Sequence, residues 1–508
     1  MTLHEYMESL RQKTVAVLGI GVSNTPLVQL LLRSGIRVTA CDKRTKEQLG
    51  TLADELEQAG CTLRLGPDYL EGLHEDVIFR TPGLRPDVPQ LAAAVANGSM
   101  LTSEMEEFFR VCPCPIIAVT GSDGKTTTTT IIAELLKAAG NTVWVGGNIG
   151  HPLLCDADRM RPQDYAVLEL SSFQLMTMDR SPHIAVVTNL APNHLDMHKD
   201  MAEYVAAKEN IFRHQTAGDI AVFNADNAIT AEQAGRTVGR SRRFSRQTEL
   251  NDGVFLRGED IVCRSEAGER VIMNTSDIKI PGVHNVENYM AAIAAVDGLV
   301  PDKCVRAVAA RFQGVEHRIE LVRELDGVKY YNDSIGTSPS RTVACLESFP
   351  EPVILIAGGY DKGIPFHALA LEIRERVKTL VLTGDTARAI RQAVEEAEGG
   401  RGCPEIIQTE DLAGAVEAAR RAAGPGDKGI ADRLLPAAGP AARGFSADSE
   451  SFGIQTVIDG LHVVPSCIGF PVDKPILLHA LSHRPDRAGP VPRSVCIDGL
   501  GRKKDPMG

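Results

Sequence analysis

The sequence predicts an α/β protein with three domains, and three observations lead to that fold class. Glycine is abundant, with 46 among 508 residues, whereas aromatic residues make up only 5% of the chain. This balance suits α/β proteins better than β-sandwiches. Continuous apolar runs such as Val15–Leu18 are typical of buried parallel strands, and they alternate with segments of helical pattern. The length leaves room for about three domains of ordinary size.

Residues 1–108 are expected to form a first, Rossmann-like domain that reads as strand, glycine turn, helix and strand. Gly19 and Gly21 permit a tight turn after the first strand, and the next helix can hold an anion on its free N–H groups. The signal is weak, because Asn24 replaces the third glycine of the dinucleotide-binding fingerprint. A turn that binds no ligand therefore remains an equal alternative.

Two further domains follow. Prolines at positions 113 and 115 indicate a linker near the start of the second domain, which is expected over residues 109–314 with a P-loop ATPase-like parallel sheet. Residues 315–427 again alternate strand and helix, which predicts a further Rossmann-like sheet.

The second domain begins with an unusual phosphate-binding loop. The segment at 121–126 has the form G-x-x-G-K-T, which is two residues shorter than the general G-x-x-x-x-G-K-[ST] motif. Its glycines let backbone N–H groups approach phosphate oxygens. Lys125 can reach the β- and γ-phosphates, and Thr126 offers a hydroxyl to Mg²⁺. The alternative is an ordinary glycine turn before a helix.

Three side chains downstream are candidates for metal or substrate. Glu169 follows the apolar run Ala166–Leu168, at the carboxyl end of a strand where open α/β sheets present ligands. It can complete the Mg²⁺ shell that Thr126 begins. His194 lies in a polar cluster after the next strand and is a candidate metal or substrate ligand. Taken alone, Glu169 also reads as a surface carboxylate, and Lys208 as a solvated helix lysine.

The third domain contributes four more candidates. Arg318 lies at the junction of the second and third domains, and Asp333, Ser338 and Lys362 lie in loops that follow predicted strands. Loops at that edge of a sheet gather ligand groups. For each residue alone, a purely structural role is an equal alternative.

Composition excludes several classes of function. The net charge of −12 and the lack of a useful basic run before the tail argue against nucleic-acid binding. No run of 18 apolar residues and no secretory signal are present, so no membrane span is expected. The 11 cysteines are mostly scattered singly, as expected of reduced thiols in the cytoplasm.

Seven segments, taken in order, resemble the Mur ligases. They read TGSDGKTTTT, LELSSFQL, NLAPNHLDMH, GVHNVENYMAA, EHRIE, YYNDSIGTSP and AGGYDKGIPF, and together they are very specific. The resemblance covers residues 10–427. It also explains the short loop, because Mur ligases use the form G-x-x-G-K-[ST].

The resemblance implies an ATP-dependent amide ligase of peptidoglycan precursor synthesis. ATP would phosphorylate the free carboxylate of UDP-N-acetylmuramoyl-L-alanine, and the amine of D-glutamate would attack the resulting acyl phosphate. The DNPR sequence typical of members that add diaminopimelate or lysine is absent here. Folylpolyglutamate synthases lack the N-terminal domain, so both comparisons favour D-glutamate addition over another amino-acid specificity. The resemblance further implies a cytoplasmic monomer that acts on small molecules.

The resemblance also implies roles for individual residues around ATP and metal. ATP would be bound by Gly121, Ser122, Asp123, Gly124, Lys125, Thr126, Thr127, Asn285, Asn288, Arg318 and Asp333. Two Mg²⁺ ions would be held by Thr126, Glu169, His194 and Lys208, the last as a carbamylated lysine whose added carboxylate is an anionic oxygen ligand. Lys125, His194 and Lys208 would form the catalytic centre.

Substrate contacts are implied in the same way. The first domain would hold the uridine diphosphate through Gly21, Ser23, Asp42, Arg44, Thr81, Pro82 and Gly83, and Asn148 would touch the acceptor substrate. Ser338 and Lys362 match positions that meet D-glutamate.

The tail over residues 428–508 departs from the family pattern. It holds 9 of the 28 prolines, and its 10 Lys and Arg exceed its 8 Asp and Glu, whereas the rest of the chain has 44 against 58. Disorder and a change of reading frame near Lys428 are the two interpretations of this composition. Either leaves the third domain incomplete, so an impaired nucleotide-binding remnant is one alternative function. An ordinary P-loop ATPase or kinase is another, although Glu169 stands where such proteins have a Walker-B aspartate.

Overall fold

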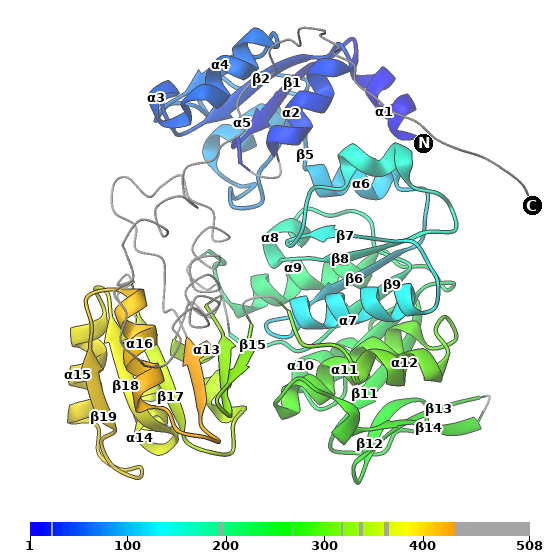
Figure 1. Ribbon diagram of the computed structural model, residues 1–508. Helices are drawn as coiled ribbons and strands as arrows, with labels where there is room; N and C mark the ends of the chain where they lie inside the picture. The colour runs from blue at the N-terminus through cyan, green and yellow to red at the C-terminus, as the bar shows by residue number, and fades with distance from the viewer. Residues whose placement is uncertain are drawn as a thin grey trace, which may run out of the picture. The chain divides into compact units, whose positions relative to one another are not determined.

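The computed structural model describes residues 1–21, 24–192, 197–266, 268–315, 318–334, 339–359 and 365–431. Within these residues, three sheets with their helices follow one another along the chain (Figure 1). Most neighbouring strands in each sheet are parallel, which confirms the predicted α/β class.

The first sheet has five parallel strands in the order β3-β2-β1-β4-β5. Its central strand is completely buried from Val15 to Leu18, as the continuous apolar run predicted. The strands are β1 (Thr14–Leu18), β2 (Arg37–Asp42), β3 (Thr62–Leu65), β4 (Val77–Phe79) and β5 (Met100–Thr102). The helices are α1 (Leu3–Leu10), α2 (Asn24–Arg33), α3 (Lys46–Leu49), α4 (Thr51–Gln58), α5 (Pro89–Ala96) and α6 (Glu104–Val111).

The second sheet has nine strands in the order β14-β13-β12-β11-β10-β9-β6-β8-β7. The strands are β6 (Ile116–Thr120), β7 (Val143–Gly147), β8 (Tyr165–Glu169), β9 (Ile184–Val187), β10 (Ile220–Asn224), β11 (Arg240–Ser245), β12 (Gly253–Arg257), β13 (Asp260–Ser265) and β14 (Gly268–Asn274). The helices are α7 (Lys125–Ala138), η1 (Leu154–Arg159), α8 (Ser172–Leu175), α9 (Met201–Arg213), α10 (Ala228–Gln233), η2 (Thr275–Asp277), α11 (Val283–Val296) and α12 (Asp302–Ala309).

The far edge of this sheet departs from the predicted parallel pattern. Strands β12, β13 and β14 pair antiparallel. Arg257 lies opposite Asp260, so only Gly258 and Glu259 connect β12 to β13. Gly258 has a φ of 60°, a left-handed conformation that two-residue hairpins favour. A connection this short excludes a parallel crossover.

The third sheet has six strands in the order β15-β16-β20-β17-β18-β19. The strands are β15 (Glu320–Leu325), β16 (Val328–Asn332), β17 (Val353–Gly358), β18 (Val377–Thr383), β19 (Glu405–Gln408) and β20 (Lys428–Ala431), and the helices are α13 (Pro339–Glu347), α14 (His367–Arg376), α15 (Ala387–Glu396) and α16 (Leu412–Ala422). The expected domain end at residue 427 therefore falls just before β20, which pairs with both β16 and β17. The rest of the expected tail, 432–508, lies outside the described residues.

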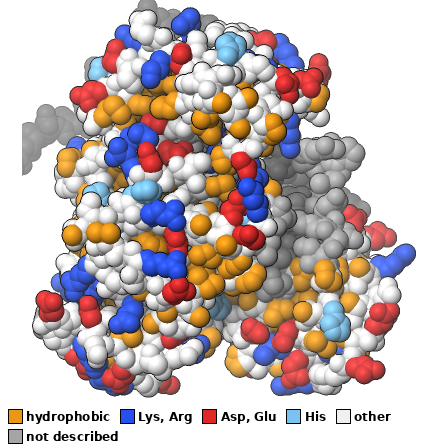
Figure 2. All heavy atoms as spheres, turned by 180° about the vertical axis from the view of Figure 1, so that it is seen from behind, with side chains coloured by type: hydrophobic (Ala, Val, Ile, Leu, Met, Phe, Trp, Pro, Cys, Tyr) orange, Lys and Arg blue, Asp and Glu red, His pale blue; other side chains and the backbone are white. Residues whose placement is uncertain are grey.

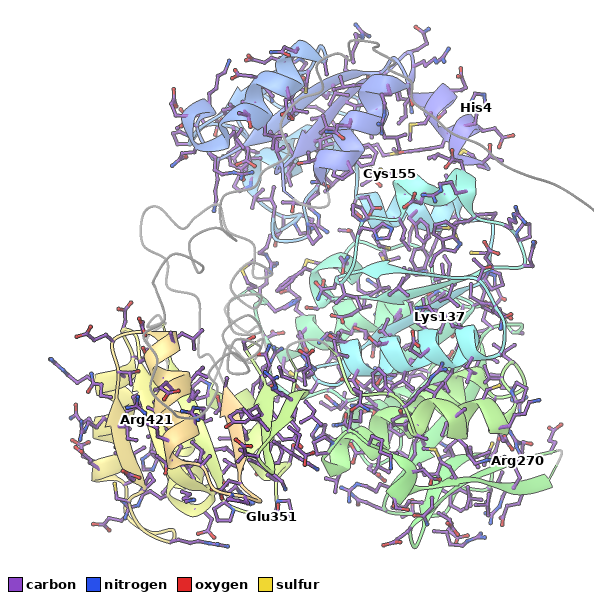
Figure 3. The ribbon with its side chains drawn as sticks, in the orientation of Figure 1. His4, Lys137, Cys155, Arg270, Glu351 and Arg421 are labelled. Atoms are coloured by element: carbon purple, nitrogen blue, oxygen red, sulfur yellow. The ribbon has the colours of Figure 1, made fainter. Side chains whose placement is uncertain are left out.

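Helix α6 connects the first two sheets through a common apolar core. Phe108 of α6 is buried in one cluster with Val17 of β1 and Leu168 of β8. The helix also packs against η1, where Cys155 is labelled in Figure 3. The expected boundary at residue 108 falls within α6, so this helix belongs to both neighbours.

The surface carries mixed charge. On the face shown in Figure 2, Lys and Arg side chains are interspersed with Asp and Glu. In the described part of the chain, every helix is too short or too polar to cross a membrane.

Candidate functional site

The short glycine loop lies between β6 and α7, and close neighbours explain its two glycines. Gly121 has a φ of 150° and Gly124 a φ of 77°, which side-chain-bearing residues rarely adopt. A Cβ atom on Gly121 would overlap the hydroxyl of Thr188, and one on Gly124 would overlap the amide oxygen of Asn288. Both positions therefore require glycine for conformation and for space.

Residues at the end of β9 hold the loop in shape. The backbone N–H groups of Ser122 and Asp123 donate to the backbone and side-chain oxygens of Asn189, at 2.8 and 3.0 Å. The hydroxyl of Thr188 donates to the carbonyl of Asp123 at 2.6 Å. The hydroxyl of Ser122 lies 3.0 Å from that of Tyr204 on α9. Thr188 and Tyr204 belong to no predicted site, because their roles arise only from these contacts.

Lys125 is folded back over the loop. Its Nζ donates to the carbonyls of Gly121 and Ser122 at 3.1 and 2.9 Å. Burial lowers its pKa, although the charges of Glu169 and Asp123 oppose that effect. A nearby anion would stabilise the charged ammonium. The N–H groups in the first turn of α7 lack partners within the helix, so they offer additional donors for an anion.

Three predicted residues meet at the carboxyl end of β8. The carboxylate of Glu169 accepts a hydrogen bond of 2.6 Å from the Thr126 hydroxyl and one of 2.7 Å from the Asn148 amide. Glu169 is only 2% exposed, so the alternative of a surface carboxylate is wrong. A hydroxyl and a carboxylate are hard oxygen donors that suit Mg²⁺. Among the described residues, no group of three or more His, Cys, Asp or Glu is arranged to hold a metal.

Lys208 lies beneath the loop rather than in solvent. It is 2% exposed, and its Nζ donates to the hydroxyl of Thr120 at 3.1 Å and to the carbonyl of Gly121 at 2.9 Å. The ammonium also lies 4.9 Å from the ring centre of Tyr204. Burial, followed by the charge of Lys125, lowers its pKa well below the ordinary value. The alternative of a solvated helix lysine is therefore wrong, and the buried amine favours its neutral, nucleophilic form.

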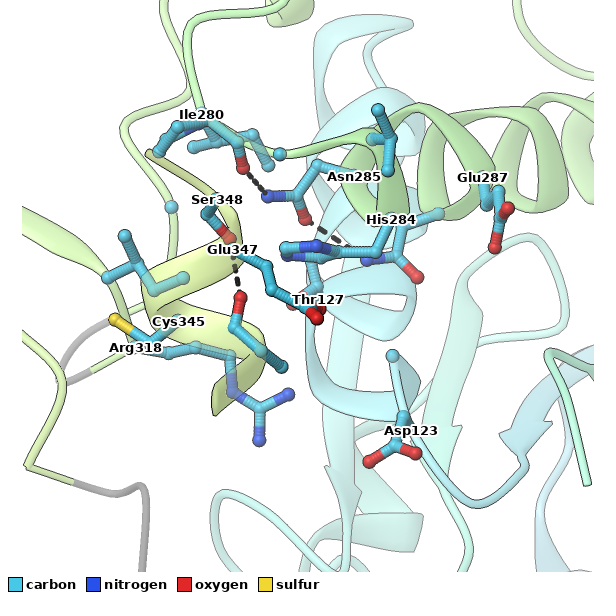
Figure 4. A pocket seen from close by; sticks show the side chains of 18 of the residues that line it. Asp123, Thr127, Ile280, His284, Asn285, Glu287, Arg318, Cys345, Glu347 and Ser348 are labelled. Atoms are coloured by element: carbon cyan, nitrogen blue, oxygen red, sulfur yellow. Dashed lines mark hydrogen bonds between the residues drawn. The ribbon is translucent and has the colours of Figure 1, made fainter. Parts of the chain in front are cut away.

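A cavity of about 330 Å³ opens beside the loop (Figure 4). It is lined by residues from the segments that carry the second and third sheets, including seven predicted ATP-site residues: Asp123, Gly124, Thr127, Asn285, Asn288, Arg318 and Asp333. Other polar residues also line the cavity, among them His284, Arg341 and Ser348, to which no ligand role was assigned from the sequence.

Two asparagines of α11 connect this cavity to the loop. Asn285 donates to the carbonyl of Pro281 at 2.5 Å and accepts from the amide of Asn288 at 3.1 Å (Figure 4). The hydroxyl of Thr128, on the loop's helix α7, donates to Asn288 at 3.2 Å. The asparagines are therefore fixed relative to the helix that carries Lys125 and Thr126.

Asp333 is held by strand β20. Its backbone N–H donates to the carbonyl of Ala431 at 2.9 Å, and its carboxylate accepts from the N–H of Ile319 at 3.0 Å. Burial raises the pKa of Asp333 to about 6, although the charge of Arg318 opposes the shift. Burial likewise lowers the pKa of Arg318. The pair therefore faces the cavity with incompletely solvated charges.

In the first domain, the predicted substrate residues lie in adjacent turns. A Cβ on Gly19, which has a φ of 83°, would lie 3.0 Å from the methyl of Thr81. Asp42 accepts from the N–H of Ile20 at 2.7 Å, and Arg44 donates to Asp42 at 2.8 Å. Burial acts to raise the pKa of Asp42, but the hydrogen bonds from Arg44 and Ile20 outweigh it and lower the pKa. The two charges neutralise each other and support the glycine turn.

The structure thus brings together the predicted loop, the Thr126–Glu169–Asn148 cluster, Lys208 and the cavity residues. Gly21, Pro82 and Gly83 lie in the two turns of the first domain. Four predicted site residues, Ser23, His194, Ser338 and Lys362, lie outside the described residues.

Comparisons with known proteins all identify the same family. The Mur ligase middle domain matches residues 119–296, and the Mur ligase glutamate ligase domain matches residues 317–430. The UDP-N-acetylmuramoylalanine–D-glutamate ligase of Acetivibrio thermocellus is 51% identical over 430 residues, covering 84% of this chain and 92% of that protein. The protein of the same name from Clostridium novyi is 48% identical over 437 residues, covering 86% of this chain and 94% of its own.

A solved structure agrees at the level of fold. The UDP-N-acetylmuramate-alanine ligase of Thermotoga maritima gives a TM-score of 0.56 at 18% identity and covers 88% of this chain and 100% of that chain. This likeness supports the order of three α/β sheets.

Proposed function

The chain belongs to the Mur ligase family, and from that premise we propose that it joins D-glutamate to UDP-N-acetylmuramoyl-L-alanine with cleavage of ATP to ADP and phosphate. The observation that carries this proposal is the cluster of Lys125, Thr126, Glu169 and Asn148 beside a cavity that also takes in Arg318 and Asp333. Relatives that bear this activity in their names are 51% and 48% identical to the chain over most of its length.

The reaction needs activation because a free carboxylate is a poor electrophile. A carboxylate oxygen of the sugar-linked alanine attacks the γ-phosphorus of ATP, and the bond from that phosphorus to ADP breaks. The amine of D-glutamate then attacks the carbonyl carbon, phosphate leaves, and the nitrogen loses a proton to give the amide. Catalysis consists mainly of positioning the reactants and neutralising their charge.

The loop residues suit the triphosphate. Lys125 is half-buried without full compensation of its charge, so a polyphosphate would supply the missing partner. Arg318, which lines the cavity, is half-buried, and burial lowers its pKa in the same way. Asn285 and Asn288 would meet the nucleoside, since their amides lie in the cavity wall and are fixed by hydrogen bonds.

Thr126, Glu169, His194 and Lys208 would hold two magnesium ions, which when bound neutralise phosphate charge. Lys208 suits this role only after modification, because an ammonium cannot ligate a cation. Its depressed pKa favours a neutral amine that can attack CO₂ and, after loss of a proton, form a carbamate. The carbamate replaces a buried positive charge with an anionic oxygen ligand.

The remaining assignments follow the same comparison. The turns at Gly19–Ser23 and Thr81–Gly83, with Asp42 and Arg44, would hold the uridine diphosphate, and Ser338 and Lys362 would meet D-glutamate. The protein would act as a monomer in the cytoplasm, in the synthesis of peptidoglycan precursors.

Phosphate release by the purified chain tests the proposal. With MgATP and UDP-N-acetylmuramoyl-L-alanine present, D-glutamate should start phosphate release, whereas L-alanine, L-lysine and diaminopimelate should not. Release that is independent of the sugar nucleotide would indicate an ordinary ATPase, and release started by another amino acid would reassign the specificity.

A second candidate function is an impaired remnant that binds both nucleotides without ligation. The departure from the family pattern after Asp427 favours it, because Mur ligases continue there with a strand and a loop that contacts D-glutamate, and this chain lacks that pattern. Binding of ATP and the sugar nucleotide without D-glutamate-dependent phosphate release would identify this state.

A further inference from the structure

Arg80 is a buried charged residue with no assigned role in the proposed reaction. It follows β4 directly and precedes the Thr81–Gly83 turn. The residue is 1% exposed, and its backbone N–H continues the sheet by donating to Thr102 at 2.7 Å. No motif marks it, because its partners are mainly backbone carbonyls.

One end of the guanidinium organises the turn that follows. Nη1 of Arg80 donates to the carbonyls of Thr81, Pro82 and Leu84, at 3.3, 3.1 and 2.7 Å. The turn's own backbone adds a bond of 3.1 Å from the N–H of Leu84 to the carbonyl of Thr81. The turn therefore wraps around a cation and is shaped by it.

The other end of the guanidinium reaches the second domain. Nη2 of Arg80 donates to the carbonyl of Phe173 and to the hydroxyl of Thr177, both at 3.1 Å. Phe173 lies in α8, four residues beyond Glu169 and the end of β8. One planar group thus joins the first domain's turn to the segment that follows the Glu169 carboxylate.

Burying the Arg80 guanidinium costs free energy, so stability alone does not explain this arrangement. Burial lowers the pKa of Arg80, and the charge of Glu106 on α6 only partly offsets that effect. Nε of Arg80 and Oε2 of Glu106 are buried and make no hydrogen bond within the described residues. Apolar side chains of similar volume often stabilise a core at least as well as buried charges. Simultaneous, directional donation to two segments is what an apolar side chain cannot supply.

We propose that Arg80 is a positioning residue that sets the spacing between the sugar-nucleotide turn at Thr81–Gly83 and the magnesium-binding end of β8. The inference rests on the proposed function, because it assumes that this turn holds the uridine diphosphate substrate. Loss of the Arg80 hydrogen bonds to both segments misplaces the reacting carboxylate relative to the γ-phosphate, while the walls of the ATP cavity stay intact.

Steady-state kinetics of Arg80→Met and Arg80→Lys test this assignment in the full chain. Arg64→Met is the matched control: Arg64 pairs with Glu75 at 3.0 Å within the first domain. Arg80→Met should lower kcat/KM for the sugar nucleotide by about a hundredfold, as misplacement of a reactant does, and leave KM for ATP unchanged. Arg80→Lys should fall between, since an ammonium cannot serve both segments. Equal losses in Arg80→Met and Arg64→Met, or a matching rise in KM for ATP, would reduce Arg80 to a scaffold role.

Amide hydrogen exchange provides a readout that does not need activity. In Arg80→Met, residues 81–84 and residues 171–177 should both lose protection, and in Arg64→Met neither segment should. Loss of protection in one segment only would contradict the proposal that Arg80 joins the two segments. If the unsubstituted chain shows no D-glutamate-dependent phosphate release, the proposed function fails, and the exchange pattern alone then decides whether Arg80 joins the two segments.

Discussion

The first and second domains contain the same local unit, a central buried strand followed by a glycine turn and a helix, yet the two units differ in charge. In each, the glycine has a positive φ and lies against a threonine just after a neighbouring strand: Gly19 against Thr81, and Gly121 against Thr188. In the first unit, the charges of Asp42 and Arg44 neutralise each other, and the Asp42 carboxylate accepts a hydrogen bond from the N–H of Ile20.

In the second unit, the charge of the half-buried Lys125 is incompletely compensated, and the Glu169 carboxylate lies at the end of the neighbouring strand. Under the proposed function, the shared topology would place a ligand at the carboxyl edge in both domains. The side chains at neighbouring strand ends would then determine whether that ligand is a triphosphate with metal or a less strongly charged group.

Replacing Lys125 should have the largest effect, because this residue distinguishes the second domain's turn from the first. Lys125→Met removes the one cation inside the loop, and loss of such a charge-stabilising group costs on the order of a thousandfold in kcat. Phosphate-release assays at saturating substrates measure the effect. Lys137→Met is the control, since Lys137 lies on the same helix, exposed and paired only with Glu134 at 3.0 Å (Figure 3). Full activity in Lys125→Met would contradict the assigned role.

Glu169→Gln should have the next largest effect. The amide keeps the size of the side chain but removes the anionic ligand, so activity should fall about a hundredfold at low Mg²⁺. Added Mg²⁺ should recover part of the loss, which a titration of the metal at fixed ATP would reveal. A loss that no concentration of Mg²⁺ relieves would point to a structural role in holding Thr126 and Asn148.

Alanine at each glycine sharpens the comparison between the two turns. Gly121→Ala places a Cβ on the Thr188 hydroxyl, whereas Gly19→Ala meets the movable Thr81 side chain at 3.0 Å. Gly121→Ala should therefore raise KM for ATP by about tenfold, the equivalent of roughly 1.4 kcal/mol. Gly19→Ala should raise only KM for the sugar nucleotide, and by less. If Gly121→Ala instead raised KM for the sugar nucleotide and Gly19→Ala raised KM for ATP, the proposed assignment of the two ligands to the two domains would be wrong.

The smallest expected effect concerns stability rather than activity, and Lys208→Met measures it. Because the folded pKa of Lys208 is lowered, the unfolded chain binds more protons between that pKa and the ordinary lysine pKa of about 10.4. Stability from this group therefore rises with pH across the window. In CO₂-free buffer without ligands, Lys208→Met should melt a few degrees higher near neutral pH, by about 2–4 °C per kcal/mol. The gain should shrink toward pH 10; Lys137→Met should show no such trend.

The sequence predicted the parts of the site that depend on local pattern. The glycine loop, Thr126 and Glu169 could be found because a buried strand shows as an apolar run and its end faces the ligand edge. Thr188, Tyr204 and Arg80 could not, because their roles depend on contacts with segments that are distant in the sequence. The antiparallel hairpin after β12 was also missed, since its two-residue turn was not recognised. The ligand roles of all these site residues stay predictions, and Ser23, His194, Ser338 and Lys362 also lie outside the described residues.

The strand order of the third sheet has a consequence for how the chain folds. β20, the last strand of the described residues, pairs between β16 and β17. The ribosome therefore synthesises the strands on both sides of β20 first, and these two halves of the sheet have no common partner until residues 428–431 emerge. Folding of this domain must wait for almost the whole described chain, and the two unpaired strand edges stay open to aggregation meanwhile.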